Sequence, residues 1–394
     1  MNHRPLVSII IDNYNYGRFL REAIDSALHQ TYDYTEIIVV DDGSTDDSPA
    51  IIQEYGNTII AIIKQNGGQA SAFNEGFKAS RGQIIVFLDS DDMLLPTAIE
   101  QVVLSFNNPD VSKVHWPMWR IDGSGGKNGE IVPVHPLAQG DLLKQLIQHG
   151  PAYFCGTAVG SPTSGNAWSR SFLDQVFPLP ESDFKTGGVD FYLFVLAPVY
   201  GQVRTISKPQ GLYRVHGSND TLKSADAYLQ TFFGWFDQSW EALYHHLLAQ
   251  DIPVDANTWK RNSWYHQIHA SMQEIVALVP PTHRFILVDE NYWATGDTLA
   301  NRHRVPFIEQ NGQYWGPPAN DSMAIEEIER QRTKGSAFIF FAWPAFWWLD
   351  YYTGMRDYLK ANYLCVINNE RLIGFGLQSN TAVHEHIEQS SAVL

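Results

Sequence analysis

The feature of this sequence that most limits its fold is a set of short apolar runs that alternate with helical patterns. Val7–Ile11, Ile37–Val40 and Ile84–Leu88 are almost wholly apolar, which is typical of strands buried on both faces. Apolar side chains recur at helical spacing between them, over residues 18–30 and 68–80. Strands that alternate with helices predict an α/β fold with a mostly parallel sheet and right-handed crossovers.

Each of these runs ends in polar or acidic residues. Asp12 and Asn13 follow the first run, Asp41 and Asp42 follow the second, and Asp89-Ser90-Asp91-Asp92 ends the last. Ligands of open α/β sheets bind beyond the carboxyl ends of the strands. We therefore expect these side chains to surround one ligand.

The run from Asp89 to Asp92 is the strongest chemical signal. Alternate residues of extended backbone point the same way, so Asp89 and Asp91 can face one ligand. Carboxylates without His or Cys suit a hard cation, Mn²⁺ or Mg²⁺, which can bridge to a diphosphate and offset the charge of a departing group. The alternative is a solvated acidic turn that caps the next helix.

Other uses of such a run fit less well. A calcium loop needs glycine at the sixth position, where this chain has Leu94. No G-x-x-x-x-G-K-[ST] segment and no G-x-G-x-x-G segment after the first strand are present, which argues against a P-loop and a dinucleotide site. A phosphatase of the haloacid-dehalogenase type also carries D-x-D after a strand. Such a motif normally lies on the first strand, and Met93 is not the residue expected after it.

Composition restricts the compartment and the partners. The chain has 394 residues, 44% of them hydrophobic, and a net charge of -16. This length predicts more than one domain, and the charge disfavours nucleic acid as a partner. With only Cys155 and Cys365 and no signal peptide, we expect a cytoplasmic protein. The apolar segment 338–349 is shorter than the roughly 20 residues that span a membrane, so we interpret it as core, with peripheral contact with the inner face of a membrane as the alternative.

Composition along the chain also predicts its domains. We expect one α/β domain over residues 1–222 and a helical extension over 223–280. In this extension an apolar stripe follows residues 229–247, a second helix is expected over residues 257–278, and Pro280-Pro281 ends the helices. Residues 281–394 predict a smaller C-terminal α/β domain. Its last elements resemble a hairpin around residues 368–370.

Four segments together resemble the inverting family 2 glycosyltransferases, which have the GT-A fold. In order, they are VSIIIDNYN at 7–15, IVVDDGSTD at 38–46, NGGQ at 66–69 with NEG at 74–76, and FLDSDD at 87–92. The resemblance covers residues 5 to about 220. It implies that a divalent cation, Mn²⁺ or Mg²⁺, assists transfer of a sugar from a UDP-, GDP- or dTDP-sugar to a glycan or lipid-linked acceptor, as in bacterial polysaccharide biosynthesis.

The resemblance also implies residue roles. The nucleotide-sugar would contact Asn13, Tyr14, Asp41, Asp42, Gly68, Asn74, Asp89, Asp92 and Arg214. The metal would be held by Asp91, Asp89 and His216, and the acceptor side would be lined by Ser164 and Gly165. Asp190 would be the catalytic base that takes the proton of the attacking hydroxyl. Capping of a helix is the alternative for Asp41, Asp42 and Asp190, and a structural role is the alternative for His216.

Two departures from the family pattern support a second hypothesis. Val189 replaces the acidic neighbour that usually precedes the base, and Phe73 stands where many relatives carry Arg. A non-catalytic protein that binds a sugar nucleotide is therefore an alternative, alongside the phosphatase. The C-terminal third resembles an α/β module that is appended to some bacterial glycosyltransferases, and its aromatic residues either stack on sugar rings or form core.

Overall fold

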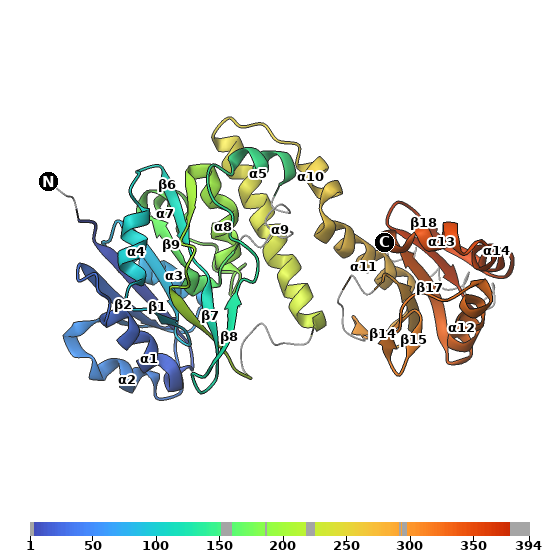
Figure 1. The fold of residues 1–394 in the computed structure, drawn as a ribbon, viewed down its shortest axis with the longest axis horizontal. Helices are drawn as coiled ribbons and strands as arrows, with labels where there is room; N and C mark the ends of the chain where they lie inside the picture. Colours follow the sequence, from blue (N-terminus) through green and yellow to red (C-terminus); the bar gives the residue numbers. More distant parts are fainter. Residues whose placement is uncertain are drawn as a thin grey trace. The chain divides into compact units, whose positions relative to one another are not determined.

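The computed structural model describes residues 4–150, 160–185, 187–217, 225–290, 293 and 298–378 (Figure 1). The chain forms two compact units. The N-terminal unit comprises residues 1–220 and 232–259, and the C-terminal unit comprises residues 221–231 and 260–394. Within the described ranges, no helix is long and apolar enough to cross a membrane. The expected domain limits near residues 222 and 280 stay a prediction, and residue 222 and Cys155 lie outside the described residues.

The N-terminal unit is built on a seven-stranded sheet with the order β10-β6-β9-β4-β1-β2-β3. Its strands are β1 (Val7–Asn13), β2 (Thr35–Asp41), β3 (Ile60–Ile63), β4 (Ile84–Asp89), β6 (Val111–His115), β9 (Asn166–Ser169) and β10 (Gln202–Thr205). Only β9 runs against its neighbours, β4 and β6. The prediction of a mixed α/β fold with a mostly parallel sheet is confirmed.

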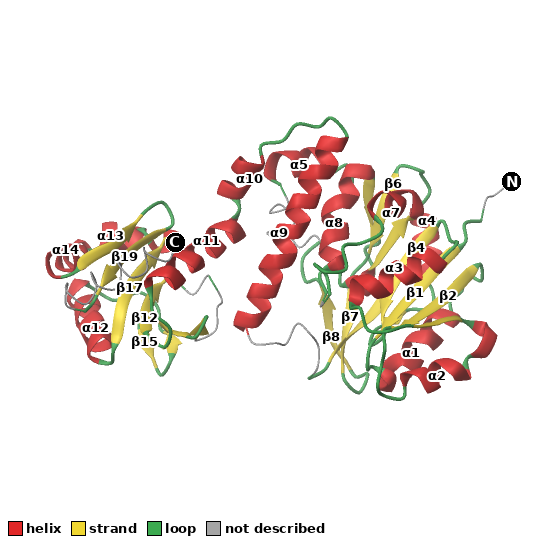
Figure 2. Cartoon of the chain, turned by 180° about the vertical axis from the view of Figure 1, so that it is seen from behind, coloured by secondary structure: helices red, strands yellow, loops and turns green. Residues whose placement is uncertain are grey.

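Helices cover both faces of this sheet, and α1 and α2 lie side by side (Figures 1 and 2). The helices are α1 (Gly17–Leu28), α2 (Ser48–Glu54), α3 (Gln69–Ala79), α4 (Ala98–Ser105), α5 (Leu143–His149), α7 (Arg170–Val176) and α8 (Val189–Tyr200). Ile9 and Ile11 of β1 pack in one core with Leu20 of α1. On the other face, α3 approaches so closely that a Cβ on Gly76 would lie 2.4 Å from Ile10 Cγ2. Successive residues of β1 therefore point to different helices.

A second, four-stranded sheet has the order β5-β11-β7-β8. Its strands are β5 (Met93–Leu94), β7 (Met118–Asp122), β8 (Lys127–Val132) and β11 (Gly211–Val215). Because β5 follows the acidic run directly and pairs with β11, residues from the far end of the unit are brought beside that run.

The helical region differs from expectation at one place. Helix α9 (Ala225–Ala249) is followed by α10 (Ala256–Asn262) and α11 (Trp264–Leu278), where the sequence predicts one helix over residues 257–278. The single-helix prediction is wrong because Ser263 leaves the helical conformation and caps α11, its Oγ accepting a hydrogen bond from His266 N.

The C-terminal unit has a six-stranded sheet with the order β13-β14-β12-β17-β19-β18 and a small hairpin. The strands are β12 (Arg284–Val288), β13 (Thr298–Leu299), β14 (Arg302–Pro306), β15 (Glu309–Gln310), β16 (Gln313–Tyr314), β17 (Ser336–Ala342), β18 (Leu364–Asn368) and β19 (Leu372–Gly376). Helices α12 (Asp321–Thr333), α13 (Trp347–Tyr351) and α14 (Thr353–Asn362) complete it. All residues of β17 are buried, as expected for the start of the apolar segment at 338, and the predicted hairpin is β18–β19.

Candidate functional site

The register of the parallel strands brings the predicted polar residues together in two pairs. Asp12 of β1 lies beside Asp89 of β4, and Asn13 lies beside Asp41 of β2. The first pair lies on the face covered by α3 and the second on the face covered by α1, since side chains alternate along a strand.

The Asn13–Asp41 pair organises the loop after β2. Asn13 Nδ2 donates to Asp41 Oδ1 at 2.8 Å and to Ser44 Oγ at 3.1 Å, and Ser44 N donates to Asp41 Oδ2 at 3.1 Å. Asp41 is fully buried. The start of α2 is instead held by Asp46, whose Oδ1 accepts from Ser48 N. Asp41 thus shapes the loop and does not cap the helix, and its contact with a nucleotide stays a prediction.

Asp42 fixes the loop that precedes α3 through hydrogen bonds to its backbone. Its carboxylate accepts hydrogen bonds from Gly67 N at 2.9 Å and Gly68 N at 2.7 Å, and it pairs with the Lys64 ammonium. Gly68 has a φ of +91°, and a Cβ there would lie 2.3 Å from Lys185 O. Only glycine fits this position, so Gly68 allows the loop to pack against the segment before α8.

Asp12 and Asp89 form a partly buried acidic pair. Ser164 Oγ accepts a hydrogen bond from Asp89 N at 3.0 Å, and Gln69 Nε2 lies 3.5 Å from Asp89 Oδ1. Burial raises the pKa of Asp12 to about 7, and the charge of Asp91 adds to this shift. Burial together with the neighbouring carboxylates raises the pKa of Asp89 well above its usual range. A cluster of this kind favours bound positive charge.

Asp91 and His216 are in direct contact. His216 Nε2 lies 3.0 Å from Asp91 Oδ2, and both side chains are largely buried. Burial raises the pKa of Asp91, whereas the hydrogen bond to His216 opposes the shift. The imidazole is held against the ring of Phe19 at 4.9 Å between centroids, and Arg18 Nη2 lies 3.2 Å from His216 Nδ1. The structure thus places in contact two side chains to which the resemblance gives a shared metal, and their role as metal ligands stays a prediction.

Arg214 ties the acidic run to β11. Its backbone N donates to Asp92 Oδ1 at 2.9 Å, and its Nε donates to the carbonyl oxygen of Asp91 at 2.9 Å. Its Nη2 pairs with Glu22 Oε2 at 2.7 Å, and the side chain is 1% exposed. Burial raises the pKa of Asp92 well above its usual range, and the second carboxylate oxygen, Oδ2, is buried without a hydrogen-bond partner among the described residues. These bonds give Arg214 a positioning role, and its predicted contact with a diphosphate stays a prediction.

Asp190 lies in the first turn of α8, close to the acidic pair. Gly188, with a φ of +84°, is the N-cap, so Asp190 is not the capping residue. Its Oδ1 accepts a hydrogen bond from Phe191 N at 2.8 Å. Burial raises the pKa of Asp190, while Phe191 N–H and the charge of Lys113 oppose the shift. The charge of Asp190 in turn contributes to the raised pKa of Asp89.

The remaining predicted residues lie at the rim or in supporting positions. Ser164 contacts the backbone of Asp89, and a Cβ on Gly165 would lie 1.9 Å from Ser161 Oγ. Tyr14 is 47% exposed. Asn74 hydrogen-bonds both backbone groups of Leu179, so the structure does not bring its side chain to the acidic cluster.

Phe73 is a core residue. It is fully buried and stacks on Phe87 with centroids 4.0 Å apart. The position where relatives carry Arg therefore supports α3 on the sheet in this chain.

Sequence reasoning missed three contributors to the site: Gln69, Lys113 and Glu22. Asp12 was expected at the ligand edge of the sheet but was given no role, although the strand register places it beside Asp89. Glu22 and Lys113 carry no local signal, since their partners Arg214 and Asp190 are distant in sequence.

The donor set suits a hard divalent cation, although no group of three or more His, Cys, Asp or Glu arranged around a metal position is found in the described ranges. Asp91 supplies carboxylate oxygen and His216 supplies imidazole nitrogen. Asp12 Oδ1 and Asp92 Oδ2 are buried without hydrogen-bond partners among the described residues. A cation would relieve both the unpaired oxygens and the mutual repulsion of the carboxylates.

Comparison with known proteins finds one matching family model and several matching relatives. The family model described as Glycosyl transferase family 2 matches residues 8–191. An uncharacterized glycosyltransferase of Nostoc sp. is 35% identical over 225 residues, which cover 56% of this chain and 68% of that relative. Chondroitin synthase of Escherichia coli is 30% identical over 266 residues, which cover 66% of this chain and 36% of the relative. The match thus spans only about a third of the length of the synthase.

The solved structures that match this chain have low sequence identity and TM-scores below 0.5. S. aureus TarS in complex with UDP-GlcNAc has a TM-score of 0.49 and 17% identity, with 69% of this chain and 75% of that chain covered. A mannosyltransferase of Pyrobaculum calidifontis in complex with GDP-Man and Mn²⁺ has a TM-score of 0.44 and 16% identity, with 71% and 77% covered.

Proposed function

The chain belongs to glycosyl transferase family 2, and we propose that it transfers one sugar from a nucleotide-diphosphate sugar to a hydroxyl group, with inversion and with Mn²⁺ or Mg²⁺ bound. The observation that carries this proposal is the convergence of Asp12, Asp89 and Asp91 with His216 at the carboxyl edge of the sheet, close to Asp190. The acidic cluster supports binding of the cation and the leaving group on one side of the anomeric carbon. The separate carboxylate of Asp190 supports activation of the acceptor hydroxyl on the other side.

The acidic cluster supports the metal and leaving-group side. Asp91 and His216 would hold the cation, with Asp89 two residues away, and Arg214 fixes the backbone that presents Asp91. When bound, the cation would offset the negative charge that grows on the departing nucleoside diphosphate. Asn13 and Asp41 shape the neighbouring loop, where we place the nucleoside.

Asp190 supports the acceptor side. In the proposed reaction, its carboxylate takes the proton of the acceptor hydroxyl while the hydroxyl oxygen bonds to the anomeric carbon and the bond to the diphosphate oxygen breaks. Because the attack and the departure occur on opposite faces, the configuration inverts. Burial raises the pKa of Asp190, which makes the carboxylate a stronger base. Ser164 and Gly165 would line this side.

We propose a glycan or a lipid-linked precursor as the acceptor, and a cytoplasmic reaction at or near the inner face of a membrane. The relative named chondroitin synthase supports a glycan product. Bacterial polysaccharide biosynthesis is the process in which we place this activity.

Donor hydrolysis and transfer by Asp91→Asn and Asp190→Asn variants test the proposal. We expect Asp91→Asn to lose metal-dependent donor binding, and Asp190→Asn to bind donor but to lose transfer. Unchanged turnover in both variants contradicts it. A parent chain that binds UDP or GDP with metal but never glycosylates an acceptor would support the non-catalytic alternative, and release of phosphate from a phosphomonoester through Asp89 would support the phosphatase.

A further inference from the structure

The C-terminal unit contains a cavity of about 480 Å³ whose polar lining is dominated by cations. Arg284 at the start of β12, His303 and Arg304 in β14, and Lys334 after α12 line it, with Glu309 of β15 as the one carboxylate in the lining. Because the whole chain carries a net charge of -16, this concentration of positive charge is a local property of the unit. The volume lies within the range of small-molecule sites, about 300–1,000 Å³.

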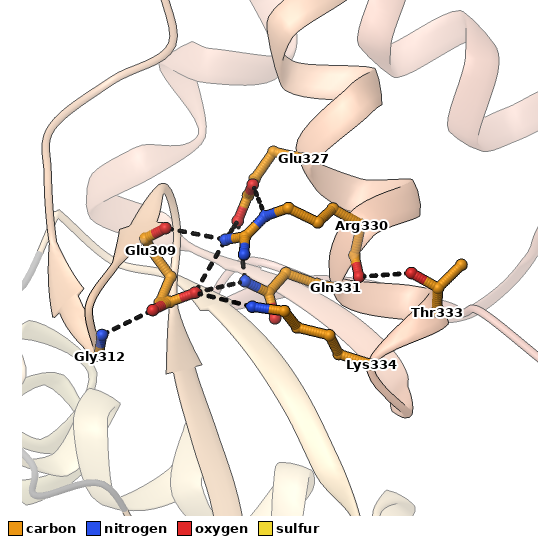
Figure 3. Close-up of polar contacts among 7 residues, drawn as sticks. All are labelled: Glu309, Gly312, Glu327, Arg330, Gln331, Thr333 and Lys334. Atoms are coloured by element: carbon orange, nitrogen blue, oxygen red, sulfur yellow. Dashed lines mark hydrogen bonds and ion pairs between the residues drawn. The ribbon is translucent and has the colours of Figure 1, made fainter.

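The carboxylate of Glu309 is held by hydrogen bonds from three groups other than Lys334 (Figure 3). Its carboxylate accepts hydrogen bonds from Arg330 Nη2 at 2.8 Å, Gln331 Nε2 at 2.9 Å and Gly312 N at 2.6 Å. The Gly312 N–H and the Arg330 guanidinium lower the pKa of Glu309 to about 2, so it stays ionised. Lys334 Nζ lies farther away, at 3.8 Å, and its side chain is half exposed. Such a pair contributes little free energy, so Lys334 can turn to an anionic ligand while Arg330 keeps Glu309 in place.

The charge of the Arg330 guanidinium is also balanced by a second carboxylate, that of Glu327. Its Nε and Nη2 donate to the Glu327 carboxylate at 2.6 and 2.7 Å (Figure 3). Arg330 and Glu327 therefore act as a rigid support for Glu309, and their charges offset each other. The positive charge that faces the single negative charge of Glu309 comes mainly from Arg284 and Lys334, because Asp289 offsets part of the charge of Arg304.

The two lining arginines have unused donors. The Nε atoms of Arg284 and Arg304 are buried, and neither has a hydrogen-bond partner among the described residues. Arg304 Nη1 lies 3.5 Å from Asp289 Oδ2, which offsets part of its charge. Arg304 pairs with Phe285 in the β12–β14 register, so its side chain lies on the opposite face of the sheet from Arg284 and is not counted among the groups that bind the ligand. Arg284 lies beside His303 in the β12–β14 register, and the two side chains share a face of the sheet. Buried donors without acceptors are costly, and an anion in the cavity would supply acceptors.

We propose that this cavity binds a phosphate-bearing ligand. Guanidinium and ammonium groups from separate elements match the several oxygens of a phosphate group, and arginine binds such a group through paired N–H donors. The remaining volume accommodates a sugar-sized substituent. The same group is carried by a soluble phosphoester and by a phospholipid headgroup. This site belongs to the C-terminal unit alone and does not depend on the proposed transferase reaction.

Calorimetric titration of the full chain in chelator, with inorganic phosphate and with a hexose 1-phosphate, tests the soluble source. Cosedimentation with phosphatidylglycerol vesicles, compared with phosphatidylcholine vesicles, tests the headgroup. Arg284→Gln and Lys334→Gln should each weaken binding by about tenfold. Lys360→Gln, at an exposed position of α14 outside the cavity lining, is the matched control and should bind like the parent. Arg284→Lys keeps the charge but loses the paired N–H donors, so it should bind more weakly than the parent and more tightly than Arg284→Gln.

Each result has a defined meaning. Soluble phosphate binding that both Gln variants weaken supports a phosphoester ligand, and vesicle binding that both variants weaken supports a headgroup. The proposal is overturned by absence of binding in every arm, by equal binding of acetate, or by binding that Asp91→Asn abolishes and Arg284→Gln leaves intact. If Arg284→Gln unfolds, Lys334→Gln still decides the result, because that side chain is half exposed and weakly paired.

Discussion

Replacement of Arg214 by Met gives the sharpest test of how the acidic run is held in place. Met keeps much of the length and removes the charge from a side chain that is 1% exposed. The change leaves the buried carbonyl of Asp91 without its donor at 2.9 Å, which costs about 1–3 kcal/mol. It also removes the guanidinium that lies 4.6 Å from the ring centroid of Phe19, worth about 1–2 kcal/mol. The ion pair with half-exposed Glu22 adds at most about 1 kcal/mol.

We therefore expect Arg214→Met to lower the free energy of unfolding by about 2–6 kcal/mol, the range that these three contributions span together. Urea denaturation at neutral pH measures it, with Glu22→Gln as the control that should cost no more than about 1 kcal/mol. A loss below about 1 kcal/mol for Arg214→Met, or an equal loss for Glu22→Gln, would refute the view that Arg214 anchors Asp91 and Asp92 through its buried contacts.

Three further predictions follow from the site. Asp190→Asn should lower the rate of transfer by about 10²–10⁴-fold with donor affinity unchanged, measured by steady-state kinetics and titration, because the base is lost and the shape is kept. Because the pKa of Asp12 is raised to about 7, the folded chain binds this proton more tightly than the unfolded chain. In chelator, the free energy of unfolding, measured by urea denaturation, should therefore fall as pH rises from about 4 to about 7. Asp12→Asn should reduce this pH dependence. Gly188→Ala should lower both stability and transfer, because a Cβ would lie 2.4 Å from Trp235 and the φ of +84° disfavours alanine. Thermal melting and transfer assays of the variant measure this, and a melting temperature and rate equal to those of the parent would contradict it.

The sheet and one half of the site were predictable because they depend on local patterns. Apolar runs buried on both faces identify β1, β2 and β4, and parallel strands place their carboxyl ends at one edge. The contact between Asp91 and His216 was reached through a resemblance to known sequences, since nothing in the spacing of residues 91 and 216 predicts it.

The other parts of the fold and of the site depend on contacts between residues that are far apart in the sequence, and local sequence patterns do not predict such contacts. Glu22 and Arg214 are 192 residues apart and meet only because β5 pairs with β11. The Ser263 cap breaks a continuous helical pattern into two helices through one side-chain hydrogen bond. The cationic cavity collects Arg284 and Lys334 from strand and helix ends that carry no recognisable motif.

The most direct test of the central claim is a calorimetric titration of the parent, Asp91→Asn and Asp190→Asn with UDP and with GDP, each with and without Mn²⁺. The parent should bind one of the nucleotides only with Mn²⁺, because the buried carboxylates repel a diphosphate in the absence of a cation. Asp190→Asn should keep this binding and Asp91→Asn should lose it. Equal affinity in chelator, or full affinity in Asp91→Asn, would contradict the assignment of a metal-dependent nucleotide site to this edge of the sheet.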